Sequence, residues 1–598
     1  MIDLTSRSVA YEDNAGVVKQ GLGTSDDFRF VRLHWEIKDE SKWTWYAKGG
    51  SSSGFYSQQH LKVNFENSGA ELWSNLSSAG NVRSNVWMLK DTVEKYFYKP
   101  GLTFTYRSKI FAPEVLPKGS IFGVTGMSIF PVNETDLFKH LAWFNSSVVN
   151  FMILNTAERY EPLFQAGKIN KTPWVDFHGE DIGLLARDVV YLKMKIDAID
   201  LASPYFSGLG LNSKSSLEVG YKQYCDVVMA DEIMIKDKVA EIDGHLLDLY
   251  QILGEDRKQI ESDIAERRNN FNSDNSFGSY NDYCSSIIEC AVGIVFGRFS
   301  KDTLTKNPEK LAECDPFAEL PSVQPAVRVG NEVCDFPIFE STELAGKVTC
   351  HLEEKFPIHS GLIITDLCEA LKVSSLDEYF TVAMKYFEGH LKRFSKSRRQ
   401  APIYWPLQSP TGKYTLWINY LCVDAQTLYR CVNDYIEPKY QRVAADLDAE
   451  RNRVERNDDV ISELELFLDE LVDLKDEILS VSKSWYPDLN DGVQLNAAPL
   501  WKLIKHKPWQ KKLRKTWGEL EEGKYDWSRM AYNFWTERVL RKCHDDRSMA
   551  ITHGVAADLW EEVEVSEGKR NKTKLVWQSK DMSEVELDTF IQNKIIKG

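Results

Sequence analysis

The spacing of hydrophobic and polar positions changes along the chain and separates strand-like from helical segments. In the first 180 or so residues, short apolar runs such as SIFGVTGMSIF lie between turn-forming residues, and Trp, Tyr, Phe, Gly and Ser are frequent. Apolar runs of this length, bounded by turn residues, are typical of β-strands. We therefore expect strands joined by loops in this region, with one helix around 137–154.

Two later segments have the spacing of a helical face, on which apolar residues recur every three or four positions. In the first segment these residues are Ile235, Val239, Ile242, Leu246, Leu249 and Leu253, and the helix is expected to continue through the charged stretch GEDRKQIESDIAERR. In the second segment, between 424 and 482, they are Val460, Leu464, Phe467, Leu471, Leu474 and Ile478. The many carboxylates of this second segment are interpreted as its solvated side rather than as a mimic of DNA.

The regions around these helices are of mixed character. A helical stretch that starts near Ile364 leads into APIYWPLQSPTGKYTLWINYL, where two β-prone runs surround Ser-Pro-Thr-Gly. This pattern predicts a β-hairpin with Pro406 at a strand end or edge. The last hundred residues, rich in Trp and Lys, are expected to be helical to about Gly554 and then to form a short strand-like tail.

These patterns predict an α+β chain of several domains, in which mixed α/β domains are joined by long helical, coiled-coil-like spacers and followed by a helical C-terminal region. A length of 598 residues fits roughly three or four domains. The expected units are 1–180 (mixed α/β), 181–275 (helical spacer), 276–435 (mixed α/β with a basic segment), 436–485 (acidic amphipathic helix) and 486–598 (rich in Trp and Lys, mainly helical).

Composition narrows the class of protein and its location. Hydrophobic residues make up 43% of the chain and charged residues 27%, as in soluble globular proteins. No run of 18 apolar residues occurs, and the N-terminus MIDLTSRSVAYEDN lacks a secretory pattern. The ten cysteines form no CxxC pair, which favours reduced, buried thiols. We expect a cytoplasmic protein that has no membrane partner.

The charge is unevenly distributed. A net charge of −16 argues against a nucleic-acid-binding protein when taken alone. However, the segment 385–399 contains six basic residues and one acid, and the segment 501–515 contains seven basic residues and no acid. By contrast, 446–477 is crowded with carboxylates. The local charges therefore leave room for a basic binding surface.

The chain lacks the common catalytic motifs. Gly21-Leu22-Gly23 precedes a strand-like stretch rather than a helix, so it does not fit a nucleotide-binding loop. The phosphate-binding GxxxxGK[ST] and the zinc-binding HExxH are absent, and GSSSG at 50–54 lacks the context of a nucleophile elbow. No Pro-Pro dipeptide occurs, so the [DNS]PP[YFW] loop that accepts a flipped base in amino-methyltransferases is missing. We predict no catalytic residue, metal site or cofactor in this chain.

Several motifs nevertheless resemble one protein family. The stretches GLGTSDDFRFVRLHWE, WTWYAKGG and FYKPGLTFTYRS resemble the region just after the catalytic domain in large adenine-specific DNA methyltransferases of type IIG restriction enzymes and of BREX (PglX-like) and DISARM phage-defence systems. The resemblance runs from about Gln20 to His553. Further matches, in the family's order, are SIFGVTGMSIF, LAWFNSSVVNFMI, VGIVFGRFS, DPFAELPS, SKSRRQAPIYWPLQSP, PDLNDGVQLNAAPLW and YDWSRMAYNFWTERV.

In that family an N-terminal methyltransferase domain carries the glycine-rich loop and an NPPY motif. The resemblance implies that this chain starts where that domain ends, so that Gly21 and Gly23 form a structural turn at the entry to a target-recognition domain in 1–180. It also implies recognition of double-stranded DNA without catalysis. Either the catalytic half is a separate polypeptide or this chain is a truncated product. In the first case S-adenosylmethionine is expected on a partner, the methyltransferase catalytic subunit, and no cofactor on this chain.

Reading a DNA groove calls for Arg and Lys, which contact guanine edges or phosphates, and for glycines where the backbone comes close. For the N-terminal candidates the alternative is a solvated surface charge, and for the cluster at 392–399 it is an exposed helix end that favours cations. Trp501, Trp509 and Trp517 are expected to be core residues. The predicted DNA-binding residues are Lys48, Gly49, Gly50, Arg107, Lys109, Lys392, Arg393, Lys396, Arg398, Arg399, Lys505, Lys507, Lys511 and Lys512.

The leading hypothesis is a DNA sequence-recognition (specificity) subunit of a split adenine-N6 DNA methyltransferase in a restriction-modification or phage-defence system. It would present the target adenine to the catalytic subunit, with other defence-system proteins as further partners. Two alternatives stay open. A nuclease would need a D-x(n)-ExK metal site, which is not found at persuasive spacing. A non-catalytic scaffold or DNA-mimic inhibitor would bind a basic partner.

Overall fold

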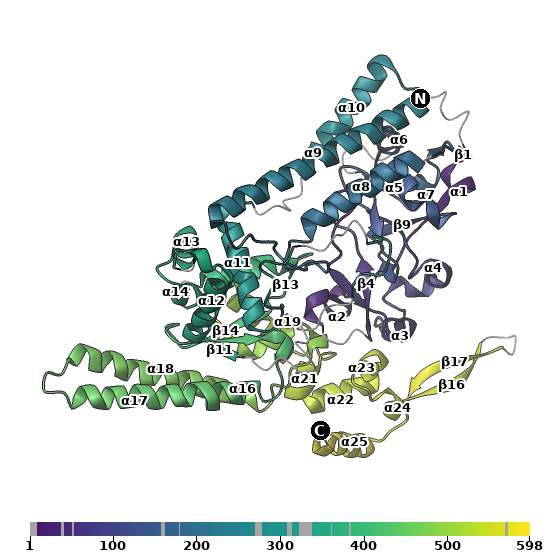
Figure 1. The fold of residues 1–598 in the computed structure, drawn as a ribbon. Helices are drawn as coiled ribbons and strands as arrows, with labels where there is room; N and C mark the ends of the chain where they lie inside the picture. Colours follow the sequence, from purple (N-terminus) through teal and green to yellow (C-terminus); the bar gives the residue numbers. More distant parts are fainter. Residues whose placement is uncertain are drawn as a thin grey trace.

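The computed structural model describes residues 9–37, 41–50, 53–156, 162–178, 180–269, 278–307, 314–321, 338–359, 361–381, 384–567 and 572–597. Helices predominate, and the strands form several small sheets that are distributed along the chain (Figure 1). The predicted α+β fold class is confirmed. None of the helices that the structure describes has the length and apolar character that a membrane span needs.

Two four-stranded sheets form the framework of the N-terminal region. Their strand pairs are antiparallel except for β4 and β8, which run parallel. The first sheet has the order β2-β9-β6-β7, and the second β3-β5-β4-β8. The strands are β2 (Gly16–Lys19), β3 (Val31–Leu33), β4 (Trp43–Ala47), β5 (Leu61–Asn64), β6 (Gly101–Thr105), β7 (Glu114–Leu116), β8 (Ser120–Phe122) and β9 (Gly126–Pro131).

The helix predicted around 137–154 is in fact two helices, α5 (Leu137–Asn145) and α6 (Ser147–Thr156). Ser146 between them has an extended backbone, and its hydroxyl donates a hydrogen bond to the carbonyl of Trp143. The Asn145 amide donates to two carbonyls, including that of Pro113 in a distant loop. Short polar side chains that bond to nearby backbone groups compete with the helix, which explains the break.

The continuous helix predicted across 235–268 is also interrupted. Helix α9 (Leu217–Leu249) ends before Gln251, which has a φ of 55°, and α10 (Gly254–Asn269) starts at a glycine with a φ of 63°. Left-handed backbone cannot continue a right-handed helix. Ile260 and Ile264 of α10 are buried, and α10 packs on α6. The charged arm therefore folds onto the N-terminal region instead of extending away from it.

The acidic segment contains two helices where one was expected. Helices α17 (Glu437–Arg451) and α18 (Asp458–Ser482) lie side by side and are joined by a turn at 452–457. Figure 1 shows this helical hairpin projecting from the rest of the molecule. Lys475 and Glu437 form an ion pair of 2.8 Å between the two helices. The predicted apolar stripe holds the helices together, since Leu471, Leu474 and Ile478 are buried.

The predicted hairpin in the middle of the chain is confirmed. Strands β14 (Tyr404–Gln408) and β15 (Thr415–Asn419) pair antiparallel, and β11 (Ile338–Glu340) adds a third strand in the order β11-β15-β14. Pro406 lies in β14, an edge strand, as expected for a residue that cannot donate to a ladder. The helices of this region are α11 (Tyr280–Val295), α12 (Ser341–Lys355), α13 (Ile363–Leu371), α14 (Leu376–Phe380) and α15 (Lys385–Arg393).

The C-terminal region is helical to Leu559 and then forms a two-stranded ribbon. The ribbon of β16 (Trp560–Glu567) and β17 (Lys572–Ser579) corresponds to the predicted strand-like tail, but a further helix, α25 (Glu584–Lys597), follows it and was not anticipated. The preceding helices are α19 (Val493–Ala497), α20 (Lys507–Glu521), α21 (Arg529–Phe534), α22 (Thr536–Asp545), α23 (Arg547–Thr552) and α24 (Ala556–Leu559).

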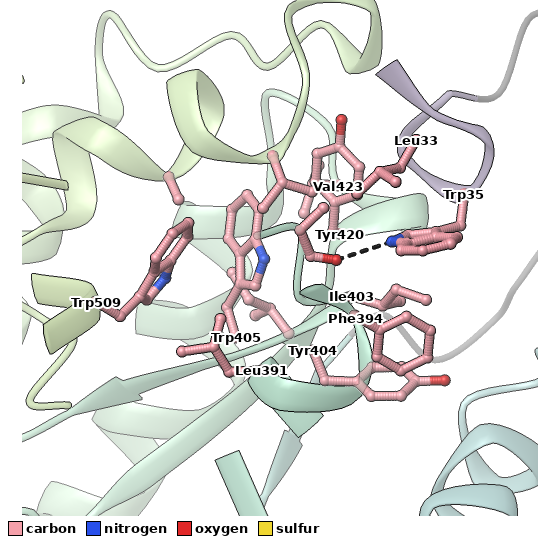
Figure 2. Packing of buried hydrophobic residues seen from close by; sticks show 14 of the residues in the cluster. Leu33, Trp35, Leu391, Phe394, Ile403, Tyr404, Trp405, Tyr420, Val423 and Trp509 are labelled. Carbon is pink, nitrogen blue, oxygen red and sulfur yellow. Dashed lines mark hydrogen bonds between the residues drawn. The ribbon is translucent and has the colours of Figure 1, made fainter. Parts of the chain in front are cut away.

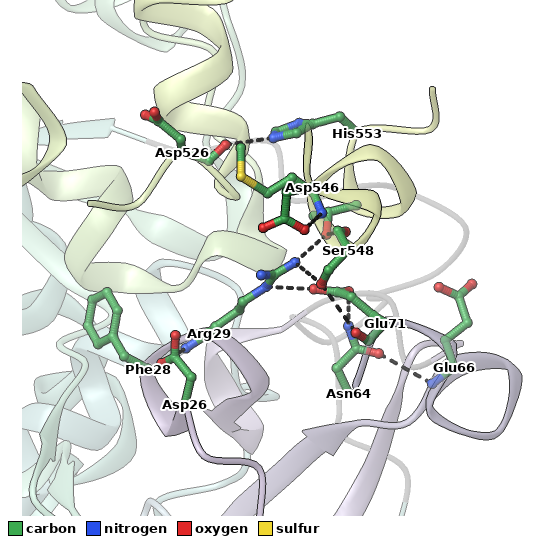
Figure 3. A network of polar contacts seen from close by, with 12 residues as sticks. Asp26, Phe28, Arg29, Asn64, Glu66, Glu71, Asp526, Asp546, Ser548 and His553 are labelled. Carbon is green, nitrogen blue, oxygen red and sulfur yellow. Dashed lines mark hydrogen bonds and ion pairs between the residues drawn. The ribbon is translucent and has the colours of Figure 1, made fainter. Parts of the chain in front are cut away.

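A buried core joins the beginning of the chain to its middle and end. Trp35 donates a 3.0 Å hydrogen bond from its indole nitrogen to the carbonyl of Ala401, among aromatic side chains that include Phe394 (Figure 2). Arg29 donates to Glu71 at 2.8 Å and to Ser548 at 2.8 Å, in the network of polar contacts drawn in Figure 3. These contacts place the middle and C-terminal segments beside the N-terminal sheets.

Candidate nucleic-acid interface

A cleft of about 2210 Å³ lies where the N-terminal sheets meet the middle and C-terminal regions. One wall comes from loops of the N-terminal sheets and from the loop that follows β6. Further lining residues come from the C-terminal end of α15, the hairpin of β12 (Ser395–Lys396) and β13 (Arg399–Gln400), and Lys512 of α20. The segments that line the cleft are 23–36, 46–61, 103–115, 197–200, 278–286, 389–400 and 491–494 in part, together with Lys512.

Most of the predicted DNA-binding residues line this one cleft. They come from segments far apart in sequence, from Lys48 to Lys512. The three that do not line it are Lys505, Lys507 and Lys511. Those that do are Lys48, Gly49, Gly50, Arg107, Lys109, Lys392, Arg393, Lys396, Arg398, Arg399 and Lys512.

The cleft has a local charge opposite in sign to that of the chain. Its lining includes ten Lys and Arg residues and seven Asp and Glu residues, although the whole chain carries a formal charge of −16. Burial raises the pKa of two of these acids, Asp197 and Asp491, to about 7. These carboxyls are only partly ionised at neutral pH, which strengthens the positive balance. A cleft lined by an excess of one charge attracts ligands of the other.

The hairpin of β12 and β13 has a strained turn. Ser395 pairs with Gln400 and Lys396 with Arg399, so the turn consists of Ser397 and Arg398 alone. Both turn residues have positive φ, 51° and 64°. This is the pattern of a type I′ turn, in which Asn-Gly is the favoured pair. Left-handed backbone costs a residue other than glycine about 1–2 kcal/mol, so this turn carries two unfavourable residues.

Most basic side chains near the turn are held by the protein. The Lys396 ammonium pairs with Asp200 at 3.0 Å, and the Arg399 guanidinium donates to the carbonyl of Asp27. Lys512 donates to the side-chain oxygen of Gln400 at 3.1 Å. Although burial opposes ionisation of Asp200, the charge of Lys396 lowers the pKa of this carboxyl. These contacts fix both strands of the hairpin in the wall of the cleft.

Three predicted residues in the cleft have no such contact. The side chains of Lys109, Lys392 and Arg398 are exposed, and within the part of the chain that the structure describes none of them forms a hydrogen bond or ion pair. Arg393, next to Lys392, donates to the hydroxyl of Ser286 at 2.8 Å. The cluster at 392–399 therefore divides into residues that hold the wall and residues that face the open cleft.

Lys48 pairs with the carboxylate of Asp27, the residue whose carbonyl also accepts from Arg399 of the hairpin. Burial raises the pKa of Asp27, but the hydrogen bonds from Lys48 and Thr24 outweigh it, so the pKa of this carboxyl is lowered. Gly49 has a φ of 77°, and a Cβ there would lie 2.5 Å from the carbonyl oxygen of Thr125. The close backbone approach expected at Gly49 is thus made to the chain's own backbone, whereas Gly50 faces open space.

The opening glycine pair has a structural role. A Cβ on Gly21 would lie 2.0 Å from the carbonyl oxygen of Phe122, and the amide of Gly23 donates to Asn85 at 2.7 Å. The neighbouring Leu22 pairs with Gly123 in an isolated parallel bridge. The stretch is therefore an extended segment that bridges to the end of strand β8, not the turn that was expected, although its role is structural. In the nearby GSSSG stretch, Ser51 and Ser52 lie outside the described residues.

The second basic stripe lies mainly outside the cleft. Lys507 and Lys511 are exposed on α20, and Lys505 donates to the carbonyl of Lys502 at 2.9 Å. As expected, Trp509 is a core residue, and Trp501 and Trp517 pack against the core. Lys512 alone faces the cleft, where burial lowers its pKa to about 8.

The sequence did not identify several polar residues of the cleft. Asp27 and Asp200 anchor its basic residues, and Gln400 and Arg32 contribute to its wall. The available signal for Arg32 and Gln400 was their position in the motifs RFVRLHWE and SKSRRQAPIYW, whereas Asp200 lies in none of the motifs. Among the residues that the structure describes, no three His, Cys, Asp or Glu side chains are grouped so as to hold a metal ion.

Comparison with known proteins gives a distant but extended similarity. An adenine-specific methyltransferase, BrxX, of Escherichia coli O9:H4 (strain HS) is 23% identical over 511 residues, which cover 77% of this chain and 39% of that protein. Another, PglX of Lacticaseibacillus casei (strain Zhang), is 21% identical over 284 residues, which cover 46% of this chain and 22% of that protein. The chain is thus similar, over part of their length, to two adenine-specific methyltransferases.

No family model matches the chain. The chain spans about two fifths of the length of BrxX and about a fifth of the length of PglX in the matched regions. The similarity to adenine-specific methyltransferases agrees with the motif resemblance, since both extend over most of the sequence.

Motifs that resemble this family meet in the core beside the cleft. Trp35 of RFVRLHWE bonds to the carbonyl of Ala401 in SKSRRQAPIYW, at 3.0 Å. Arg32 of the same motif donates to the carbonyl of Asn490 in PDLNDGV, at 3.0 Å, and its guanidinium lies 5.7 Å from the ring centre of Trp527 in YDWSRM. Four segments of the resemblance thus assemble into one structure, and the cleft is built on it.

Proposed function

We infer that the chain is the DNA-recognition part of an adenine-specific DNA methyltransferase of a phage-defence or restriction-modification system. It holds duplex DNA in the cleft and presents the target adenine to a methyltransferase catalytic subunit. That subunit supplies S-adenosylmethionine, and this chain binds no cofactor. Other proteins of the defence system are further partners.

The observation that carries this proposal is the convergence of eleven of the fourteen predicted DNA-binding residues on one cleft. Charge and motif alone predict these residues. Side chains from three separate parts of the chain, around Lys48, Arg398 and Lys512, share this surface. A basic surface that collects distant segments is the electrostatic footprint of a nucleic-acid-binding protein.

The cleft also offers the two kinds of contact that recognition needs. Lysines such as Lys109 and Lys392 can neutralise phosphates, which positions the duplex but carries no sequence information. Arginine and glutamine side chains, such as Arg398 and Gln400, have donor and acceptor geometries that suit base edges. The acids in the wall hold the basic residues in place.

The first test is binding of the full chain to fluorescein-labelled duplex DNA, measured by fluorescence anisotropy. We expect the double variant K392A/R398A to bind at least about tenfold more weakly than wild type, because two exposed cleft cations are lost. The variant K90A/K413A removes the same charge at exposed positions outside the cleft and is expected to bind like wild type. Equal binding by both variants would refute the cleft as the DNA site.

The second test is transfer of radiolabelled methyl groups from S-adenosylmethionine to DNA. We expect transfer at a defined site only when the chain is mixed with a methyltransferase catalytic subunit. K392A/R398A should lower transfer by the mixture, and K90A/K413A should not. If the mixture is inactive while the catalytic subunit is folded and binds its cofactor, the recognition role is wrong.

A further inference from the structure

We propose that Arg398, at the tip of the β12–β13 hairpin, reads a guanine in the recognised DNA site through the edge of the base. This proposal rests on the proposed function, because it specifies what the cleft recognises. It assigns the site a ligand class, a duplex with guanine at a defined position, and divides the basic residues of the cleft into one base reader and several supporting residues.

The first argument is the allocation of contacts. Arg393 bonds to Ser286, Lys396 pairs with Asp200, and Arg399 donates to the carbonyl of Asp27. Arg398 lies between two residues that are held, yet its own side chain is exposed, lines the cleft and has no hydrogen-bond or ion-pair partner among the described residues. The anchored strands therefore present this one guanidinium on a rigid support.

The second argument is the backbone of the turn. Ser397 and Arg398 both have positive φ in the two-residue connection between β12 and β13. A turn that serves only to reverse the chain would be relaxed by glycine or asparagine at these positions. A large side chain kept in strained backbone within a cleft points to a function for that side chain.

The third argument is the match of shape and chemistry. A two-stranded ribbon fits the major groove of B-DNA, and the tip of a hairpin is its narrowest part. A guanidinium has two parallel donors that match the O6 and N7 acceptors of guanine, which is the commonest specific contact to a base. Lys392, one helix turn before the hairpin, suits a phosphate because an ammonium is a point charge.

The test starts with selection of duplexes by the full wild-type chain from a random-sequence library. The enriched motif is then compared with those selected by R398A, R398K and K392A. We expect R398A and R398K to lose one guanine position and to keep the other positions. K392A should keep the complete motif with lower affinity, and S397G, which retains the arginine and relaxes its neighbour, should select the wild-type motif.

A modified base provides the chemical check. The guanine assigned to Arg398 is replaced by 7-deazaguanine, which lacks the N7 acceptor. The wild-type chain should bind this duplex about tenfold more weakly, as expected for loss of part of a bidentate contact. R398A should bind the modified and unmodified duplexes equally.

The possible outcomes separate the two proposals. If R398A selects the same motif as wild type, or is as sensitive to 7-deazaguanine, the reading role of Arg398 is wrong while DNA recognition by the chain stands. If the wild-type chain binds DNA but enriches no motif, the reading role of Arg398 is also wrong, while DNA binding by the chain stands. If the wild-type chain binds no duplex at low salt, the proposed function fails, and the role of Arg398 fails with it.

Discussion

Replacement of Lys392 by alanine should change the salt dependence of DNA binding by an amount that the structure fixes. Of the predicted residues in the cleft, Lys109, Lys392 and Arg398 have exposed side chains without a partner among the described residues. Each phosphate that is neutralised contributes about −0.9 to the slope of log K against log salt, so the two lysines give a slope of about −1.8, since Arg398 is assigned to a base. For K392A we expect about −0.9.

These slopes predict losses of DNA affinity with added salt that are large enough to measure. Between about 50 and 200 mM salt, the affinity of the wild-type chain should fall about 12-fold and that of K392A about 3.5-fold. The assay is a titration of labelled duplex by anisotropy at several salt concentrations, with K413A as the charge-matched control outside the cleft. An unchanged slope in K392A would refute its contact with a phosphate. A wild-type slope near zero would refute electrostatic binding in the cleft altogether.

Three further predictions concern stability, measured as unfolding in urea. Arg29→Ala should lower the free energy of unfolding by about 3–5 kcal/mol, because the buried guanidinium is lost and the largely buried Glu71 keeps only its hydrogen bond from Asn64. Gly21→Ala should destabilise by at least about 1–3 kcal/mol through overpacking, whereas Gly167→Ala, where a Cβ meets no atom within 4 Å, should not. Burial lowers the pKa of His34 to about 3, so the stabilisation by its neutral ring is complete above about pH 6.5 and is lost as the pH falls toward 3. His34→Gln should flatten this dependence, and an unchanged pH profile would contradict it.

The sequence predicted the class of the fold and several elements. The hairpin of β14 and β15 could be predicted because two β-prone runs flank a Ser-Pro-Thr-Gly turn. The position of β14 at the edge of its sheet was indicated by Pro406. The breaks between α5 and α6 and between α9 and α10 could not be predicted from the sequence. They depend on contacts such as Asn145 with the carbonyl of Pro113 and on the positive φ of Gln251, neither of which leaves a periodic signal.

The site was predictable as a collection of basic residues but not as a surface. The sequence marked the cluster at 392–399, yet it could not show that Lys396 and Arg399 are used to hold the wall while Arg398 faces the cleft. That division depends on Asp27 and Asp200, which lie far from the cluster in sequence. Contacts over such separations are set by the tertiary fold, not by local pattern.

The bond between Arg29 and Ser548 has a consequence for how the chain is made. The two residues are 519 positions apart, and Arg29 is buried only once its C-terminal partners are in place. A ribosome that adds about 5–20 residues per second needs roughly half a minute to two minutes to reach Ser548 after Arg29. During this interval the N-terminal sheets expose charge and apolar surface that the finished protein covers. We therefore expect nascent and truncated chains to depend on chaperones, and engineered fragments that end before 548 to aggregate.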